Sequence, residues 1–330
     1  MINNSNVFLD KKIENSISYH AEKLTVVVPC YNEQDVLQQA AATLEKQLDA
    51  MIEAGLVAAE SCILFVDDGS RDDTWRLITE LAGSSPMVQG LKLSRNVGHQ
   101  NALLAGLAHV KDGPCISIDA DLQDDVLTMS CMVEHYRQGC QVVYGIRQDR
   151  ATDTLFKRNS AYLFYKVMAL LGVETIENHA DFRLLGSAAR KAVLSFTEEN
   201  LYLRGIVPLV GFKTASVYYA RKPRAAGESK YPLLKMLALA ARGITSFSVV
   251  PLRMIAVLGV AVFLFGILHS IWSVIDKLFF QPAVGWASLS SLICIIGGLQ
   301  MLALGVVGEY IGCIYTEVKR RPRYFVEQTL

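Results

Sequence analysis

The chain has 330 residues, with 32 basic and 32 acidic side chains and a hydrophobic share of 52%. A formal net charge of zero argues against a nucleic-acid partner, since no overall charge draws the molecule to a polyanion. The length suits one large domain or two ordinary ones. The seven cysteines show neither paired metal-ligand spacing nor a compact disulfide framework, which is typical of reduced, buried thiols in the cytosol.

Residues 1–22 are polar and rich in Asn and Ser, so they predict a flexible tail without a signal peptide. Beyond them, β-branched runs alternate with helical patterns. Strands are predicted at residues 24–29, 62–66, 88–93, 115–118 and 141–144, and helices up to 54, from 72 or 73 to 81, at 101–110 and at 126–137. Strands alternating with helices of about 10 to 20 residues indicate βαβ units and a mostly parallel α/β sheet.

Polar clusters follow three of the predicted strands, at residues 31–33, 67–70 and 119–123. The carboxyl ends of parallel strands share one edge of a sheet, so these clusters are expected to meet in one cleft. Asp119 and Asp121 point the same way in an extended segment, and the nearby Gln123 adds a neutral oxygen. Mg²⁺ and Mn²⁺ favour such oxygen ligands and often keep phosphate oxygens as the others. A lone Asp-x-Asp is more often an acidic surface turn, but the convergence favours a metal–nucleotide cleft.

The sequence lacks the two common glycine-rich phosphate loops. No Gly-x-Gly-x-x-Gly follows the first strand and no Gly-x-x-x-x-Gly-Lys-Ser/Thr occurs, so neither a dinucleotide fold nor a P-loop is expected. Phosphates would instead be held by a metal and by Arg or Lys side chains. Carboxylates at Glu33 and Asp68 suit the donors of a base edge or of ribose hydroxyls.

Between residues 147 and 230 the chain becomes basic and less regular. Arginine pairs with phosphate in a bidentate manner and lysine acts as a point charge, although a single basic residue is more often a solvated surface charge. Residues 227–231 fit a loop that closes a lysine over a diphosphate. Asp181 and Arg183, in an apolar segment, fit a buried ion pair as well as a catalytic role. The candidates to face anions are Arg147, Lys157, Arg158, Arg183, Arg204, Arg221, Arg224 and Lys230.

Two runs without Asp, Glu, Lys or Arg, at 254–275 and 289–307, have 22 and 19 residues, which is enough for each to cross a bilayer as a helix. They predict a transmembrane hairpin within residues 252–312. The link between the runs has one basic residue, Lys277, whereas seven flank the hairpin, so the positive-inside rule places both flanks in the cytosol. The seven are Lys235, Arg242, Arg253, Lys319, Arg320, Arg321 and Arg323.

The segments on either side of the hairpin differ in character. Residues 231–251 mix leucine with basic side chains and fit amphipathic helices lying in the membrane interface. Residues 313–330 are expected to form a cytosolic C-terminal tail. The whole pattern predicts a multi-pass protein of the inner (cytoplasmic) membrane, with the domain at residues 23–230 on the cytosolic side.

Seven motifs together are far more specific than Asp-x-Asp alone. They are VVVPCYNE (26–33), VDDGSRDDT (66–74), RNVGHQNALLAGL (95–107), DADLQDD (119–125), DFRL (181–184), GESKY (227–231) and residues 308–324. With them, the chain from about residue 23 onward resembles bacterial polyprenyl-phosphate glycosyltransferases of glycosyltransferase family two, such as bactoprenol glucosyltransferases, which are relatives of dolichyl-phosphate mannose synthase. The resemblance implies a GT-A fold, Mg²⁺ or Mn²⁺ as cofactor, and transfer from a nucleotide-sugar to polyprenyl phosphate.

The resemblance also implies roles for individual positions. The residues expected to bind the nucleotide-sugar are Pro29, Tyr31, Glu33, Val66, Asp68, Asp119, Ala120, Arg224 and Lys230. Asp119, Asp121 and Gln123 are expected to hold the metal, Arg147 and Arg158 to contact the acceptor phosphate, and Asp119, Asp121, Asp181 and Arg147 to form the catalytic set. Two features depart from the family: Asp125 and Val126 stand where many relatives have proline, and the spacing from Arg147 to Arg158 varies.

The implied reaction inverts the sugar as the lipid phosphate displaces the nucleoside diphosphate. Asp181 is expected to position a substrate, because a phosphate monoester, with a second pKa of about 6, is already largely dianionic. UDP-glucose is the favoured donor over other nucleotide-sugars, since residues 181–184 look like the glucosyl-type members, and a homo-oligomer is expected. The alternatives are a processive polysaccharide synthase, whose Gln-x-x-Arg-Trp motif is missing, and a nucleotide-sensing membrane protein without catalysis.

Overall fold

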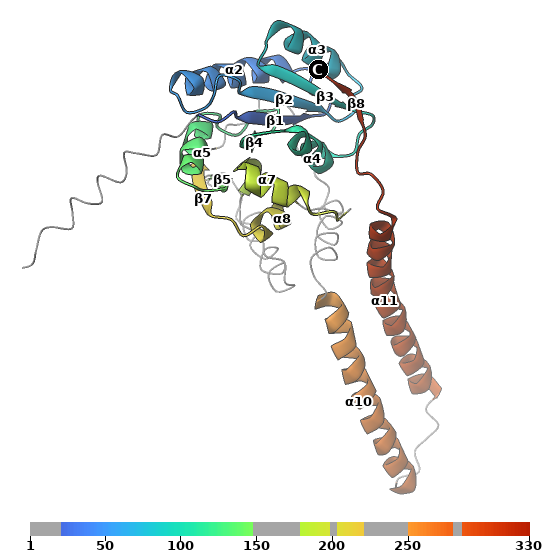
Figure 1. Cartoon of the computed structure of the whole chain (residues 1–330). Helices are drawn as coiled ribbons and strands as arrows, with labels where there is room; N and C mark the ends of the chain where they lie inside the picture. Colours follow the sequence, from blue (N-terminus) through green and yellow to red (C-terminus); the bar gives the residue numbers. More distant parts are fainter. Residues whose placement is uncertain (1–20, 148–178, 199–202, 221–249, 280–285) are drawn as a thin grey trace, which may run out of the picture.

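The computed structural model describes residues 21–147, 179–198, 203–220, 250–279 and 286–330 (Figure 1). The predictions on Arg158, Arg224, Lys230 and the loop at 227–231 lie outside the described residues. So do most of the N-terminal tail predicted at 1–22 and of the interfacial helices predicted at 231–251.

Every strand and helix predicted in the first half is present. The elements are β1 (Thr25–Cys30), α2 (Leu37–Glu53), β2 (Cys62–Asp67), α3 (Thr74–Ser84), β3 (Val88–Leu93), α4 (His99–His109), β4 (Cys115–Ser117), α5 (Thr128–Arg137), β5 (Val142–Arg147), β6 (His179–Leu185), α7 (Ser187–Leu194), α8 (Leu203–Leu209), β7 (Thr214–Tyr219), α10 (Val250–Phe279), α11 (Trp286–Lys319) and β8 (Val326–Thr329).

The strands form one sheet in the order β7-β5-β6-β4-β1-β2-β3-β8. β1 pairs in parallel with β2 and β4, β2 with β3, and β5 with β7. β6 runs antiparallel between β4 and β5, and β8 runs antiparallel beside β3. The predicted mixed α/β fold with a mostly parallel sheet is therefore confirmed, and the carboxyl ends of β1, β2 and β4 share one edge. We call this the carboxyl edge.

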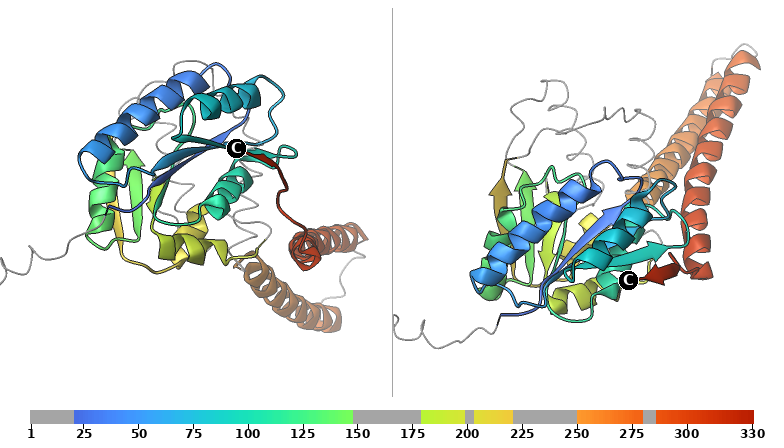
Figure 2. Two further views of the ribbon diagram at one scale, coloured as in Figure 1. Left: turned by 45° about the horizontal axis from the view of Figure 1, so that its top comes forward. Right: turned by 90° about the horizontal axis from the view of Figure 1, so that it is seen from above.

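Helices cover both faces of the sheet, as Figures 1 and 2 show. Successive residues of a strand face opposite sides, so Val26 and Val28 pack with α2, α3 and α5, whereas Val27 packs with α4, α7 and α8. α4 lies close to the sheet because a Cβ at Gly106 would stand 2.4 Å from Cγ1 of Val27. This close packing fixes the first turn of α4 beside the carboxyl edge.

The C-terminal residues belong to the sheet, so the prediction of a tail at 313–330 is wrong. α11 extends to Lys319, and β8 then pairs with β3. Two further contacts hold this segment: the Ser94 N–H donates to the Phe325 carbonyl (3.0 Å), and Nη2 of Arg323 donates to the Phe196 carbonyl (3.0 Å). Because β8 is antiparallel to β3, its first residue lies at the carboxyl edge. The end of α11 is thus joined to the sheet at that edge.

α10 and α11 form a helical hairpin that runs side by side away from the sheet (Figure 2). The predicted spans at 254–275 and 289–307 fall within these helices. Among the described residues, one stretch, Ile296–Lys319, is long and apolar enough to cross a membrane, and α10 has only a shorter apolar stretch at Leu252–Leu268. The structure alone therefore supports one span and does not support the predicted multi-pass topology.

Candidate active site

The acidic stretch after β4 turns sharply as it leaves the sheet. The Ile118 N–H still donates to the carbonyl of Val27 (3.1 Å), and the Leu122 N–H then donates to the carbonyl of Asp119 (3.2 Å). Leu122 itself has a left-handed backbone (φ 43°). The turn is further held by the Gln123 N–H, which donates to Oδ1 of Asp121 (3.3 Å). It leaves the two carboxylates of the Asp-x-Asp motif at the carboxyl edge.

Asp119 has a buried carboxylate oxygen without a hydrogen bond. Among the residues that the structure describes, no donor lies within hydrogen-bond geometry of its Oδ1. Burial raises the pKa of Asp119, and the charges of Asp181, Asp124 and Asp121 raise it further against the opposing charge of His99. Buried anionic oxygens require a cationic partner, and oxygen donors of this kind suit Mg²⁺ or Mn²⁺. The donor set therefore fits a divalent cation.

The described residues contain no group of three or more His, Cys, Asp or Glu side chains arranged to hold a metal. A cation at Asp119 and Asp121 would thus draw its remaining ligands from elsewhere. Mg²⁺ commonly binds through one or two carboxylates together with substrate phosphates and water. Gln123, which is buried, is the neighbouring amide.

His99, two side chains of β6 and one of α8 form a second polar cluster at the edge. Nε2 of His99 lies 3.5 Å from Oδ1 of Asp119 and 3.6 Å from Oδ2 of Asp181. Asp181 also accepts from Nη2 of the buried Arg183, and Arg204 donates to both of its oxygens, at 3.3 and 3.1 Å. The antiparallel pairing of β6, which sets Arg183 opposite Ser117 of β4, brings Asp181 beside the acidic stretch.

The charges around Asp181 decide what its carboxyl group can do. Burial opposes ionisation, but the hydrogen bond from His99 and the charges of Arg183 and Arg204 outweigh it and hold the pKa of Asp181 well below its usual range. For His99, burial lowers the pKa of the imidazole, whereas Asp181 and Asp119 more than reverse this and raise it. A carboxylate of such low basicity is a poor proton acceptor. Asp181 therefore suits positioning, as predicted, and not general-base catalysis.

Arg147, at the end of β5, is held by a third cluster. Its Nε and Nη2 lie 3.0 and 2.9 Å from Oδ1 of the buried Asp124. The hydroxyl of Tyr219, the last residue of β7, donates to the same oxygen (2.6 Å). Arg147 and Tyr219 are register partners in the parallel β5–β7 pair. The last residue of each strand therefore lies at the carboxyl edge.

The tips of β1 and β2 complete the edge. Burial and the charges of Asp121 and Asp119 raise the pKa of Glu33, which places this carboxyl group in the field of the acidic stretch. The two oxygens of Asp68 accept from the backbone N–H groups of Val97 (2.7 Å) and Gly98 (2.9 Å). Asp68 thereby fixes the loop that leads into α4 and its first residue, His99.

The remaining predicted donor-site residues lie at the ends of β1 and β2 or, for Ala120, just after β4. Pro29 and Val66 are register partners in the β1–β2 pair. Ala120 is buried, and Tyr31 is exposed at the tip of β1 (41%). The sheet therefore brings all of the predicted site residues that lie in the described part of the chain to a single edge.

Sequence reasoning missed several residues at this edge. His99 lies inside the motif at 95–107. The glycine before it, Gly98, has a left-handed backbone (φ 90°), and the presence of that glycine is the local feature of the sequence that could have pointed to His99. Asp124 lies within the acidic motif at 119–125, but nothing in the sequence indicates that it pairs with Arg147. Tyr219 comes from a strand that the sequence pattern did not predict.

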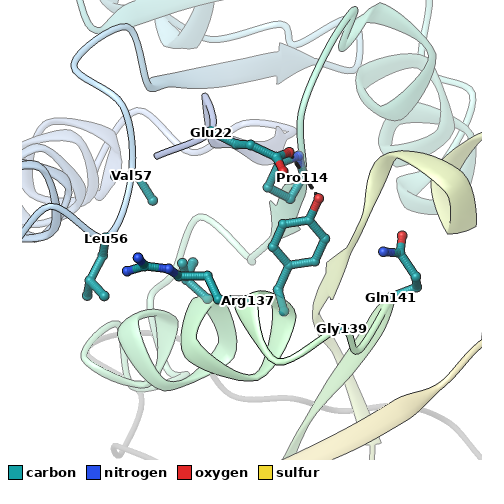
Figure 3. A pocket seen from close by; sticks show the side chains of 9 residues that line it. Glu22, Leu56, Val57, Pro114, Arg137, Gly139 and Gln141 are labelled. Carbon is teal, nitrogen blue, oxygen red and sulfur yellow. Dashed lines mark hydrogen bonds between the residues drawn. The ribbon is translucent and has the colours of Figure 1, made fainter. Parts of the chain in front are cut away.

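A separate hollow of about 180 Å³ opens at the opposite edge of the sheet (Figure 3). Two of the residues that line it, Pro114 and Gln141, immediately precede β4 and β5. Within the hollow, the Tyr136 hydroxyl donates to the carboxylate of Glu22 (3.0 Å). The hollow is remote in the fold from the polar clusters of the carboxyl edge and takes no part in them.

Comparisons with known proteins agree with this arrangement. The profile of the family described as "Glycosyl transferase family 2" matches residues 25–194, and that of the "GtrB C-terminal hairpin" matches residues 250–314. The chain is 50% identical over 306 residues to the uncharacterized glycosyltransferase YkoT of Bacillus subtilis, covering 92% of this chain and 91% of that protein. It is 38% identical over 309 residues to the SfII prophage-derived bactoprenol glucosyl transferase of Shigella flexneri, covering 93% and 98%.

A solved structure is similar at a lower level. The mannosyltransferase PcManGT from Pyrobaculum calidifontis, in complex with GDP-Man and Mn²⁺, has a TM-score of 0.40 at 15% identity, covering 86% of this chain and 87% of that one.

Proposed function

The chain belongs to glycosyl transferase family 2, and we propose that it transfers glucose from a nucleotide-sugar onto polyprenyl phosphate at a membrane surface. The family makes it a glycosyltransferase. The lipid acceptor and the glucosyl group are supported by the relatives named as bactoprenol glucosyl transferases, which match almost the whole chain. UDP-glucose is the proposed donor.

One observation supports the proposal most strongly. The carboxyl edge gathers acidic side chains on one side, with a buried Asp119 oxygen that lacks a hydrogen bond, and cationic side chains on the other. A nucleotide-sugar bound through a cation needs the first group, and an anionic acceptor needs the second. The two groups meet where Asp181, which pairs with His99 and Arg204, lies beside the acidic stretch.

Asp119 and Asp121, with Gln123, are proposed to hold Mg²⁺ or Mn²⁺. When bound, this ion would neutralise charge that develops on the leaving diphosphate. Glu33 and Tyr31 at the tip of β1 are proposed to contact the nucleoside, and Asp68 to keep the α4 loop in place beside it, in addition to its predicted part in nucleotide binding.

The roles proposed for residues on the acceptor side follow from the negative charge of the lipid phosphate. A phosphate monoester has a second pKa of about 6 and is mostly dianionic at neutral pH, so its oxygen attacks the anomeric carbon without a base to remove a proton. The attack comes from the face opposite the nucleoside diphosphate and inverts the configuration. Arg147 is proposed to bind the acceptor phosphate, since it presents a guanidinium at the same edge as the acidic stretch. Asp181 orients His99 and Arg204 beside the sugar.

The membrane arrangement is also part of the proposal. The hairpin formed by α10 and α11 is proposed to cross the inner membrane twice, with the sheet on the cytosolic side. Support comes from the match to the GtrB C-terminal hairpin and from the basic flanks of the two helices. Because α11 joins β8 at the carboxyl edge, the site would lie close to the lipid headgroups, where a polyprenyl phosphate presents its phosphate.

The test is a panel of radiolabelled nucleotide-sugars assayed with purified protein and undecaprenyl phosphate in detergent. We expect transfer from UDP-glucose, release of UDP only when the lipid phosphate is supplied, and loss of turnover in EDTA that Mg²⁺ or Mn²⁺ restores. A product with one sugar per lipid is expected; a ladder of longer products would identify a processive synthase. UDP release that does not depend on the lipid, or no transfer from any donor, would refute the proposal.

A further inference from the structure

We infer that Asp124 and Tyr219 are positioning residues that hold Arg147 for the acceptor phosphate and link it to the acidic loop. This inference rests on the proposed function, because it takes Arg147 as the residue that meets the lipid phosphate. The loop between β4 and α5 carries Asp124 as well as Asp119 and Asp121. The donor side and the acceptor side would therefore share a single buried hydrogen-bonded junction.

Asp124 is the centre of this junction. Its side chain is almost fully buried (2% exposed), and its Oδ1 accepts from Nε of Arg147 and from the hydroxyl of Tyr219 and forms an ion pair with Nη2 of Arg147 (2.9 Å). A buried carboxylate is tolerated only when it is paired and hydrogen-bonded. Two hydrogen bonds and an ion pair on one oxygen meet that need, so Asp124 has a fixed place in the loop.

The same contacts fix the orientation of Arg147. Nε and Nη2 both point at Asp124, so one edge of the planar guanidinium is committed to that carboxylate. Within the described residues, Nη1 has no hydrogen bond or ion pair, and the side chain is 27% exposed. A guanidinium held on one edge and open on the other is suited to a phosphate oxygen, and its orientation is set before the ligand arrives.

Tyr219 supports the junction from the neighbouring strand. Its ring packs edge-to-face on Phe182, with centroids 5.5 Å apart and planes at 83°. Phe182 follows Asp181 in β6, so one aromatic contact joins the Arg147 junction to the Asp181 cluster. Burial and the Asp124 carboxylate raise the pKa of Tyr219, and its phenol therefore remains a neutral hydrogen-bond donor at any working pH.

The mildest test removes one hydroxyl. Tyr219→Phe keeps the ring and its packing but takes away one donor to a charged group. We expect the KM for undecaprenyl phosphate to rise about tenfold, while the KM for the nucleotide-sugar and kcat stay within about twofold. The matched control is Tyr218→Phe, the adjacent and exposed tyrosine (58%) of the same strand, which should change none of the three constants.

A double-variant comparison separates positioning from general loosening of the fold. Positioning through Arg147 requires that Tyr219→Phe have almost no further effect on acceptor KM when Arg147→Ala is already present. A second tenfold loss in that background, or an equal rise in the KM for the donor, would overturn the inference. So would a Tyr219→Phe enzyme that is indistinguishable from the wild type.

A binding measurement tests the inference without requiring turnover. Vesicles with and without undecaprenyl phosphate, otherwise of one composition, are sedimented with the full chain. We expect the lipid phosphate to strengthen binding of the wild type and Tyr219→Phe to reduce that gain. If the wild type binds but transfers no sugar, the proposed function fails and the junction is still tested. If the gain is absent or insensitive to Tyr219, the inference fails.

Discussion

The tips of β2 and β4 carry the same chemistry, acidic side chains at the carboxyl edge, and use it in opposite ways. At β2, both oxygens of Asp68 accept from backbone N–H groups of the loop before α4. At β4, Oδ1 of Asp119 is buried and has no hydrogen bond within the described part of the chain, where it lies 3.5 Å from a histidine nitrogen. Among the described residues, the hydrogen-bonding capacity of Asp68 is therefore met and that of Asp119 is not.

The contrast between Asp68 and Asp119 distinguishes structural from ligand-binding carboxylates. A carboxylate whose lone pairs are taken by backbone N–H groups stabilises the local fold, and its removal leaves those donors unsatisfied. A carboxylate whose buried oxygen lacks a partner is held by its surroundings in a place that needs an external cation. Variants at the β4 tip should therefore lose mainly activity, and variants at the β2 tip should lose mainly stability.

The largest effect is expected at the β4 tip. Asp119→Ala removes a proposed metal ligand and should lower kcat/KM at least about 100-fold. The melting temperature should stay equal to or above that of the wild type, because the raised pKa of Asp119 means that its ionised form opposes folding. The measurement is turnover over a Mn²⁺ titration beside a thermal melt. Asp112→Ala, an exposed acid on the loop before β4, is the control; equal losses in both variants would contradict the assignment.

Asp181→Asn should give the next largest effect. It removes the charge that pairs with Arg183 and Arg204, and we expect a loss of about tenfold to 100-fold in turnover through misplaced groups. Because the pKa of Asp181 is already far below neutrality, raising the pH should not restore the rate. Recovery of activity at high pH would support a general-base role instead.

The same variant makes a prediction for stability. The folded-state pKa of Asp181 lies below that of an unfolded aspartate, about 3.9. The ionised carboxylate therefore stabilises the fold above about pH 4, and this contribution is lost as the pH falls further. The gap between the unfolding free energies of wild type and Asp181→Asn should be wide at pH 7 and narrow toward pH 3. A gap that is constant with pH would contradict the ion pairing.

At the β2 tip, a smaller and mainly structural effect is expected. Asp68→Asn leaves one backbone N–H of the α4 loop facing an amide donor, which should lower the free energy of unfolding by about 2 kcal/mol. Thermal and urea unfolding measure this, with the exposed Asp35→Asn as the matched control. Full stability together with a strong rise in the donor KM would show that Asp68 serves the nucleotide more than the loop.

The smallest effect is expected where β8 meets β3. Lys92 and Glu327 form an ion pair at 3.2 Å between side chains that are 26% and 49% exposed. Exposed pairs of this kind contribute about 0 to 1 kcal/mol. Lys92→Ala should therefore change the melting temperature little, and turnover not at all. A large loss of activity would show that the β3–β8 junction transmits the position of the helical hairpin to the carboxyl edge.

The features of the fold that depend on local sequence pattern could be predicted from the amino-acid sequence. β-branched runs between helical segments predicted a parallel sheet, and parallel connectivity forces the tips of β1, β2 and β4 to one edge. That geometric consequence predicts that Glu33, Asp119 and Asp121 lie close together. The raised pKa of Glu33, to which the charges of Asp121 and Asp119 contribute, agrees with this prediction.

The partners of those side chains depend on tertiary contacts that the sequence pattern does not reveal. The antiparallel insertion of β6 sets Asp181 beside the acidic stretch, the β5–β7 register sets Tyr219 next to Arg147, and the return of β8 to β3 makes a strand of a segment predicted as a tail. Each of these depends on pairing between residues far apart in the chain. Local propensity and hydrophobic periodicity do not contain strand order or register, because they describe each segment alone, whereas pairing is selected by the packing of the whole sheet.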